Sequence, residues 1–213
     1  MSAIRDYHNK VKYKLLEEYS SLVHGNIRLL DIGVGRGGDI HKWNKCNIDT
    51  VYGFDVSKGS IIEAIKRFKS CAYIKNKNYK FFYYKKQDGY LKFLQEKCNG
   101  ISKFHIVSCM FAFHYFFENE TMIQMFFTQL DSVLHHDGYV LICVPSGDEI
   151  LKLLNGHNVY TNNLLEIESK FDKLQELGNT IHFYMVDTLY FGDKCPSKEY
   201  LIFSEIGTPN VMT

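Results

Sequence analysis

Several features that would mark a specialised class of protein are scarce in this chain of 213 residues. It has only 3 prolines, which argues against a disordered chain or a linker. None of its 6 cysteines forms a C-x-x-C pair, so the sequence predicts neither a zinc site nor a thioredoxin-type motif. No apolar run approaches the ~18 residues of a membrane helix, and the charged N-terminus lacks the apolar segment of a signal peptide. We therefore expect one globular domain in a reducing compartment, with no membrane partner.

The charge is nearly balanced overall but uneven along the chain. The formal net charge is +1. Residues 1–86 hold 17 Lys and Arg against 8 Asp and Glu, whereas residues 87–213 hold 8 against 16. Such asymmetry points to a polyanionic partner for the basic part. The alternative is a balance of opposite charges between the faces of one fold.

Apolar runs alternate with amphipathic segments over the first two thirds of the chain. The predicted strands are continuous apolar runs rather than alternating ones, which indicates a parallel sheet with helices on both faces. The expected strands are Arg28–Ile32, Thr50–Asp55, Lys80–Tyr84, Phe104–Phe111 and Gly138–Val144. The expected helices are Tyr7–Tyr19, Gly37–Asn44, a segment that begins at Ser57, and Thr121–Leu134. Beyond Pro145 the pattern predicts a helix over Asn162–Leu177 and strands over Thr180–Asp187 and Tyr200–Phe203.

A glycine-rich turn follows the first expected strand. Gly33, Gly35 and Gly38 match the dinucleotide pattern G-x-G-x-x-G, which is weak evidence when it stands alone. A diphosphate would lie at the N-terminus of the following helix, where Asp31 and Asp39 would repel it. The same carboxylates suit a ligand that carries an ammonium and a sulfonium, as S-adenosylmethionine does. The alternative for Asp39 is a plain helix N-cap.

Two further acids lie near the ends of the next two expected strands. Asp55 ends the second expected strand, where it can accept hydrogen bonds from ribose hydroxyls, and Asp88 follows the third, where it can reach an adenine amino group. Acids thus recur after successive strands of a parallel sheet, whose carboxyl ends share one edge. The sequence predicts a binding site for S-adenosylmethionine at that edge.

Longer segments carry a resemblance to a known family. The runs LLDIGVGRGGDIHKW, YGFDVSKGSIIEAIKRF and IVSCMFAFHYFFENE resemble mRNA cap guanine-N7 methyltransferases, and RDYHNKVKYKLL is similar to that family's N-terminal helix. The resemblance implies a Rossmann-like class I methyltransferase, a mostly parallel α/β sheet with helices on both faces. It implies a single domain over residues 1–213. Residues 1–27 would hold the N-terminal helix, residues 28–145 the cofactor-binding core, and residues 146–213 a cap-pocket insertion and C-terminal strands.

The same resemblance implies roles for individual residues. The implied cofactor-binding set is Lys12, Asp31, Gly33, Gly35, Asp39, Asp55, Asp88, Met110, Phe111 and Tyr115. The implied cap pocket is His114, Tyr115, Glu199, Arg36 and Pro145. It implies no metal. Because guanine N7 has a free lone pair, the methyl group would be transferred by in-line displacement without a general base, through proximity and electrostatics.

Two departures from the family pattern leave alternatives open. Met110 stands where the family usually has glutamine, and the family continues for some tens of residues beyond its equivalent of Glu199-Tyr200-Leu201. We expect either a fold truncated at the C-terminus, as in a fragment of a longer capping enzyme, or a non-catalytic or incomplete subunit of a capping complex. A class I methyltransferase with another substrate is a further alternative. The expected partners are the capped 5′ end of RNA and other capping domains or subunits, in the nucleus or, for a viral enzyme, in the cytoplasm or virion.

Overall fold

The computed structural model describes residues 3–74, 77–84, 96–97, 103–185 and 196–204. The chain divides into two compact units. Unit 1 comprises Met1–Ala112 and Phe127–Cys143, and unit 2 comprises Phe113–Phe126 and Val144–Thr213. Each unit has its own sheet and its own hydrophobic core.

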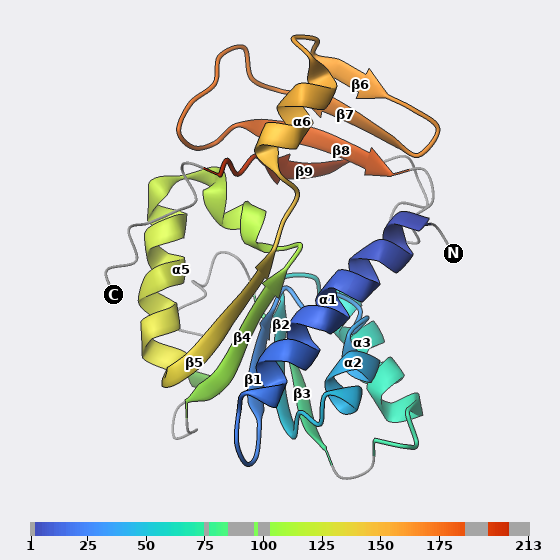
Figure 1. Cartoon of the computed structure of the whole chain (residues 1–213), viewed down its shortest axis with the longest axis vertical. Coiled ribbons are helices and arrows are strands. Elements are labelled where there is room, and N and C mark those ends of the chain that lie inside the picture. The colour runs from blue at the N-terminus through green and yellow to red at the C-terminus, as the bar shows by residue number, and fades with distance from the viewer. Residues whose placement is uncertain (1–2, 75–76, 85–95, 98–102, 186–195, 205–213) are drawn as a thin grey trace. The chain divides into compact units, whose positions relative to one another are not determined.

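Unit 1 is built on a five-stranded parallel sheet in the order β3-β2-β1-β4-β5 (Figure 1). Its strands are β1 (Arg28–Ile32), β2 (Thr50–Asp55), β3 (Asn78–Tyr83), β4 (Phe104–Met110) and β5 (Leu134–Cys143). The central strands are almost wholly buried, which explains why they form continuous apolar runs. The predicted parallel sheet is confirmed.

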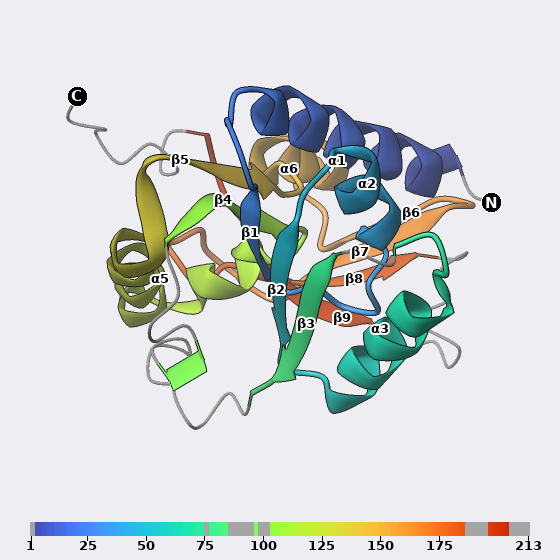
Figure 2. The same ribbon diagram turned by 90° about the horizontal axis from the view of Figure 1, so that it is seen from below.

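Helices cover both faces of this sheet, as the sequence predicted. Figure 2 shows α1 (Ala3–Ser21), α2 (Ile40–Lys45) and α3 (Lys58–Ser70) on one face, with α5 (Glu120–Val133) on the other. The start of α3 is fixed by Ser57, whose Oγ accepts a hydrogen bond from the Ser60 amide at 3.2 Å. Among the described residues, no helix combines the length and apolar character needed to span a membrane.

The core of unit 1 lies between the sheet and the helices α1 to α3. It includes Leu16 of α1, Ile61 of α3 and Trp43 of α2. Trp43 is only 1% exposed, and its ring contacts those of Tyr79 and Phe81 on β3. The short helix α2 is therefore held by a large buried side chain rather than by its own length.

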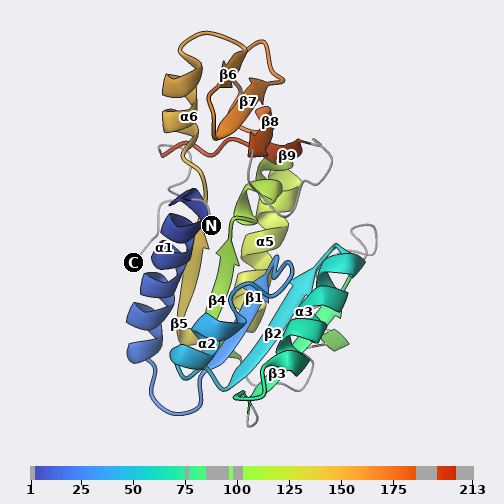
Figure 3. The same ribbon diagram turned by 90° about the vertical axis from the view of Figure 1, so that its right-hand side faces the viewer.

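Unit 2 contains a four-stranded antiparallel sheet in the order β6-β7-β8-β9 (Figure 3). Its elements are the 3₁₀ helix η2 (Phe113–Glu118), α6 (Gly147–Leu154), β6 (Val159–Thr161), β7 (Leu165–Ser169), β8 (Thr180–Met185) and β9 (Ser197–Tyr200). A small core joins α6 to the sheet through Ile150, Leu154, Ile167, Ile181 and Leu201.

The structure corrects two sequence predictions in unit 2. The predicted helix over Asn162–Leu177 is wrong, because strand β7 occupies Leu165–Ser169. Its apolar residues alternate with glutamates, and only Ile167 is deeply buried, which is the pattern of a strand with one face on a core. The last predicted strand, Tyr200–Phe203, lies earlier, at Ser197–Tyr200.

Candidate functional site

The glycine-rich turn connects β1 to α2 in unit 1. Gly33 has a φ of +79°, and a Cβ added to it would lie 2.4 Å from the Cβ of Ala112. The amides of Gly33 and Val34 both donate to the carbonyl of Phe54, at 2.9 and 3.0 Å. The turn is thus fixed against the end of β2, in a conformation that excludes a side chain at Gly33.

The glycine fingerprint is shifted from the one that the sequence suggested. Gly38 has ordinary backbone angles, and a Cβ there would meet nothing within 4 Å. Gly37 instead has a φ of +70°, and its Cβ would lie 2.7 Å from Cδ1 of Ile40 and 3.2 Å from Cα of Ala64. The close approach of the turn to α3 therefore requires Gly37, whereas the packing of the chain itself does not require a glycine at position 38.

Asp39 is held between two lysines. Its Oδ2 accepts from Nζ of Lys12 at 2.8 Å, and its Oδ1 accepts from Nζ of Lys42 at 2.6 Å. Burial alone would raise the pKa of Asp39, but the two positive charges outweigh it and lower the pKa. Asp39 occupies the N-cap position of α2 without any side-chain capping bond. The interpretation of Asp39 as a plain helix cap is therefore wrong.

Asp31 lies beneath the same turn and is buried. Its Oδ1 accepts a 2.5 Å hydrogen bond from Oγ of Ser108, which is its direct partner in the register of β1 and β4. Burial and the nearby charge of Asp39 raise the pKa of Asp31 to about 7, against the opposing effects of Ser108 and Lys12. The neutral, protonated form of Asp31 is thus favoured far more than for an exposed aspartate.

Asp55 ends β2 and is bound by backbone amides. Its Oδ2 accepts from the Gly35 amide at 2.8 Å, and its Oδ1 accepts from the Ser57 amide at 2.7 Å. Each carboxylate oxygen has a second lone pair, so the group can still accept from a vicinal diol. Asp88, the fourth acid of the prediction, lies outside the described residues.

Two predicted cofactor residues lie at the end of β4: Met110 is its last residue, and Phe111 follows it. Met110 is buried in the core of unit 1, which leaves its backbone but not its side chain for a ligand. Phe111 has a φ of +58°, a costly conformation for an aromatic residue. It is held by a 2.7 Å bond from its amide to the Cys143 carbonyl and by the His8 ring, whose centroid lies 4.4 Å from its own.

Unit 2 brings together two predicted cap residues that are far apart in the sequence. Nε2 of His114 lies 3.8 Å from Oε2 of Glu199, while Oε1 of Glu199 accepts from Ser197 Oγ at 2.7 Å. Burial lowers the pKa of His114 to about 4 and raises the pKa of Glu199, which the Ser197 hydrogen bond partly offsets. Among the residues that the structure describes, neither ring nitrogen of the buried His114 has a hydrogen-bond partner. Buried polar atoms without a partner are costly, which makes this ring a candidate for contact with a ligand.

The remaining predicted cap residues are divided between the units. Tyr115, also in the predicted cofactor set, is 44% exposed, and its ring centroid lies 4.2 Å from that of His114. Pro145 belongs to unit 2. It lies after the end of β5 and just before Ser146, the N-cap residue of α6. Arg36 lies in the glycine-rich turn of unit 1. Within this set, the contacts of His114 with Glu199 and Tyr115 bring three predicted cap residues together in unit 2.

Sequence reasoning missed several residues of both groups. Neither Lys42 nor its partner Asn9 is among the predicted site residues, although the Asp39–Lys42 spacing of three is a helical ion-pair signal. Ser108 and Ser197, which hold Asp31 and Glu199, carried no local signal. The role of Ser108 depends on the register of β1 and β4, which a single sequence does not specify. Ser197 and Glu199 lie two residues apart on β9, so their contact depends on the assignment of that strand.

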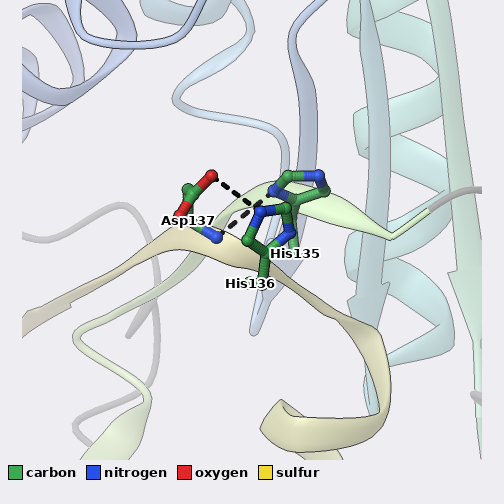
Figure 4. Close-up of side chains that lie close together, drawn as sticks. All are labelled: His135, His136 and Asp137. Atoms are coloured by element: carbon green, nitrogen blue, oxygen red, sulfur yellow. Dashed lines mark hydrogen bonds and ion pairs between the residues drawn. The ribbon is translucent and has the colours of Figure 1, made fainter.

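A separate polar group lies at the start of β5 (Figure 4). His136 Nε2 lies 2.9 Å from Asp137 Oδ2, and the Asp137 amide donates to Nδ1 of His135 at 3.3 Å. Their ligand atoms lie within 4.8 Å of one another, where the ladder of β4 and β5 shifts register. His136 and Asp137 are 78% and 79% exposed, so a solvated surface pair accounts for them. That the chain uses no metal stays a prediction.

The fold of unit 1 defines a class of protein. A parallel sheet whose first strand leads through a glycine turn into a helix, with acids at the carboxyl ends of β1 and β2, is the Rossmann-like fold of class I methyltransferases. The structure of the chain is similar to that of an S-adenosylmethionine-dependent methyltransferase from Clostridium acetobutylicum. The TM-score is 0.57, with 15% identity over 91% of this chain and 76% of that one. The structure is also similar to that of the plantazolicin methyltransferase BpumL, with a TM-score of 0.51 and 17% identity over 70% of this chain and 51% of that one.

The sequence places the chain more narrowly. The model of the mRNA (guanine-N(7))-methyltransferase domain matches residues 1–206, and the chain belongs to that family. Among its relatives, the mRNA cap guanine-N(7) methyltransferase of Caenorhabditis elegans is 28% identical over 82% of this chain. That of Drosophila melanogaster is 26% identical over 85%. The match covers 47% of each relative, so the chain spans about half the length of the curated relatives it matches.

Proposed function

We propose that the chain transfers the methyl group of S-adenosylmethionine to N7 of the guanine cap of RNA, converting GpppN-RNA to m7GpppN-RNA. The observation that carries this proposal is the family match over residues 1–206. The paired charges of the glycine turn and the His114–Glu199 pair are consistent with it. The proposed partners are a capped RNA 5′ end and other capping domains or subunits.

The charges around the glycine turn fit the proposed cofactor. Lys12 and Asp39 offer a cation and an anion at 2.8 Å, which suits the carboxylate and ammonium of an amino-acid group. Asp55 retains acceptor capacity for ribose hydroxyls, and Asp31 adds negative character beneath the turn. When bound, S-adenosylmethionine would supply an electrophilic methyl carbon, and the chain's contribution is to hold and orient it.

The residues of unit 2 fit the recognition of guanine. An ionised Glu199 can accept from both N1–H and the exocyclic amine of guanine, a pattern that adenine does not offer. Because the pKa of His114 is about 4, its ring is neutral at pH 7 and offers one donor and one acceptor nitrogen. Tyr115 presents an exposed ring beside it for stacking. No general base is required, because N7 attacks with its own lone pair.

A methyl-transfer assay tests the proposal. The chain and a version extended to the full natural protein are incubated with labelled S-adenosylmethionine and GpppG-capped RNA, and digestion should release labelled m7GpppG. RNA with an ApppG end and RNA already carrying m7G serve as controls and should remain unlabelled. Labelling of both controls would indicate another methylation site, and no labelling by either protein would overturn the proposal.

A non-catalytic role is the second candidate, and Met110 is the observation that favours it. Its side chain is packed in the core and cannot make the hydrogen bonds of the family's usual glutamine. Calorimetry with S-adenosylhomocysteine separates the two functions. Micromolar binding together with methyl transfer supports the enzyme, whereas the absence of binding by the full protein supports a subunit that keeps only the fold.

A further inference from the structure

Lys42 has an unusual environment for a lysine. Its side chain is only 12% exposed, and its ammonium donates to Asp39 Oδ1 at 2.6 Å, to Asn9 Oδ1 at 2.9 Å and to the Gly38 carbonyl at 3.4 Å. All three donors of the ammonium are therefore used by the protein itself. Burying a charged group without partners costs free energy. The three contacts of the Lys42 ammonium offset this cost and hold the side chain in place.

These contacts join three segments of unit 1. Asn9 and Lys12 belong to α1, Gly38 and Asp39 end the glycine turn, and Lys42 lies in α2. Asp39 receives one lysine from α1 and one from α2. The turn is thus fixed to α1 by side-chain contacts in addition to the backbone bonds that fix it to β2.

Lys42 supplies the second positive charge of a group that is rich in carboxylates. Asp31 interacts electrostatically with Asp39, Asp55 and Lys12. Without Lys42, Lys12 would be the one lysine on Asp39, and the carboxylates beside the turn would be less well compensated. A more anionic group would repel the carboxylate of an amino acid more strongly.

We propose that Lys42 is a positioning residue that sets the charge of the glycine turn, so that the site accepts the zwitterionic amino-acid end of S-adenosylmethionine. This inference rests on the proposed function and adds a source of specificity to it. Lys42 acts through Asp39 and Lys12, because its own donors are already occupied. Its loss should therefore weaken ligands that carry the amino-acid group and spare those that lack it.

Two ligands and three variants test the idea. S-adenosylhomocysteine carries the amino-acid group, and 5′-methylthioadenosine is its nucleoside part without that group. For Lys42→Met we expect a roughly tenfold or larger rise in the Kd of S-adenosylhomocysteine, the size of one charge-assisted interaction, with the Kd of 5′-methylthioadenosine within about twofold of wild type. Lys42→Gln should behave like Lys42→Met, and Lys42→Arg should recover most of the affinity. In turnover, KM for S-adenosylmethionine should rise while kcat is retained.

Lys45→Met is the matched control. Lys45 lies in the same helix, is exposed, and has its ammonium 5.7 Å from the centre of the Tyr13 ring. It should leave both dissociation constants unchanged. Asn9→Ala, which removes one partner of Lys42 but keeps the charge, should leave the ratio of the two constants unchanged.

The outcomes separate this inference from the proposed function. If wild-type protein fails to bind S-adenosylhomocysteine, the cofactor proposal fails. If it binds, and Lys42→Met and Lys42→Gln weaken both ligands equally or neither, Lys42 has no selective role and the inference is overturned. Thermal unfolding of each variant identifies loss of structure. If the neutral variants fail to fold, Lys42→Arg is compared with wild type, and an equal loss of affinity for both ligands in that variant overturns the inference.

Discussion

The predicted cofactor residues of unit 1 and the predicted cap residues of unit 2 differ in one respect. They differ in whether their polar side-chain atoms already have hydrogen-bond or ion-pair partners within the chain. In unit 1, the described carboxylates Asp31, Asp39 and Asp55 all have partners from the chain itself. In unit 2, His114 is buried, its ring nitrogens have no hydrogen-bond partner within the described part of the chain, and its Nε2 lies 3.8 Å from Oε2 of Glu199. The first group is held by contacts within the chain, and the second contains buried atoms that a ligand could satisfy.

This difference has an energetic consequence. A satisfied network holds its geometry and lowers the entropy cost of binding, while an orphaned buried group destabilises the free protein until a partner arrives. We therefore expect substitutions in unit 1 to affect both affinity and stability. Those in unit 2 should affect recognition, at little or no cost to stability. The following changes test that contrast, from the largest expected effect to the smallest.

Asp39→Ala should have the largest effect. It leaves the ammonium groups of Lys12 and Lys42 without their shared anion, so we expect the Kd for S-adenosylhomocysteine to rise by roughly 100-fold, about 2.7 kcal/mol. Isothermal calorimetry measures it. Asp137→Ala, at an exposed carboxylate of β5, is the control and should bind normally. Unchanged affinity in Asp39→Ala would show that the charge pairs do not serve the cofactor.

Glu199→Gln should separate substrate recognition from cofactor binding. The amide can accept only one of the two guanine hydrogen bonds, so kcat/KM for capped RNA should fall by roughly 30-fold, about 2 kcal/mol. The Kd for S-adenosylhomocysteine should stay unchanged. Glu168→Gln, on β7 and paired with Lys170, should leave both quantities intact. Equal losses of cofactor and RNA affinity in Glu199→Gln would contradict the division of roles.

Asp31→Asn should alter how stability depends on pH. The pKa of Asp31 is raised to about 7 in the folded protein, so the folded state holds its proton more tightly than the unfolded state does. Its contribution to stability is full at low pH and is lost as the pH rises from about 4 to about 7. The neutral variant should escape this loss and gain on the order of 2 kcal/mol over wild type between pH 5 and pH 8.

Urea unfolding of Asp31→Asn at several pH values measures this effect, with Asp137→Asn as the exposed control. A difference from wild type that does not grow with pH would mean that Asp31 is ionised throughout. The same variant should bind S-adenosylhomocysteine less tightly, since it removes one charge of the group around the glycine turn.

His114→Leu should show the smallest change in stability. It replaces two unpartnered buried nitrogens with apolar atoms of similar volume, so the free energy of unfolding at pH 7 should stay level or rise by about 1 kcal/mol. With its pKa lowered to about 4, His114 also costs wild type stability as the pH falls from about 6.5 to about 4, and the variant should lack that part of the decline. Urea titrations at pH 7 and pH 5 measure both. A clear loss at pH 7 would mean that His114 serves the structure.

Much of unit 1 could be predicted from the sequence, because its strands are continuous apolar runs and its helix α3 begins at a capping serine, Ser57. The glycine turn was found, but whether Gly37 or Gly38 is needed depends on the approach of Ala64, which is a tertiary contact. The hydrogen bond of Ser108 to Asp31 likewise depends on register. In unit 2, short runs such as LLEIES fit both periodicities, so the wrong element was predicted there.

Trp43 makes the intrinsic fluorescence of the chain easy to interpret. It is the single tryptophan of the sequence, it is 1% exposed, and it directly follows Lys42 in α2. The tryptophan fluorescence therefore comes from one buried environment, in which the rings of Tyr79 and Phe81 are neighbours. Rearrangement of the glycine turn around a ligand should change its intensity or its access to quenchers. Intrinsic fluorescence thus offers a label-free signal for this one part of the molecule.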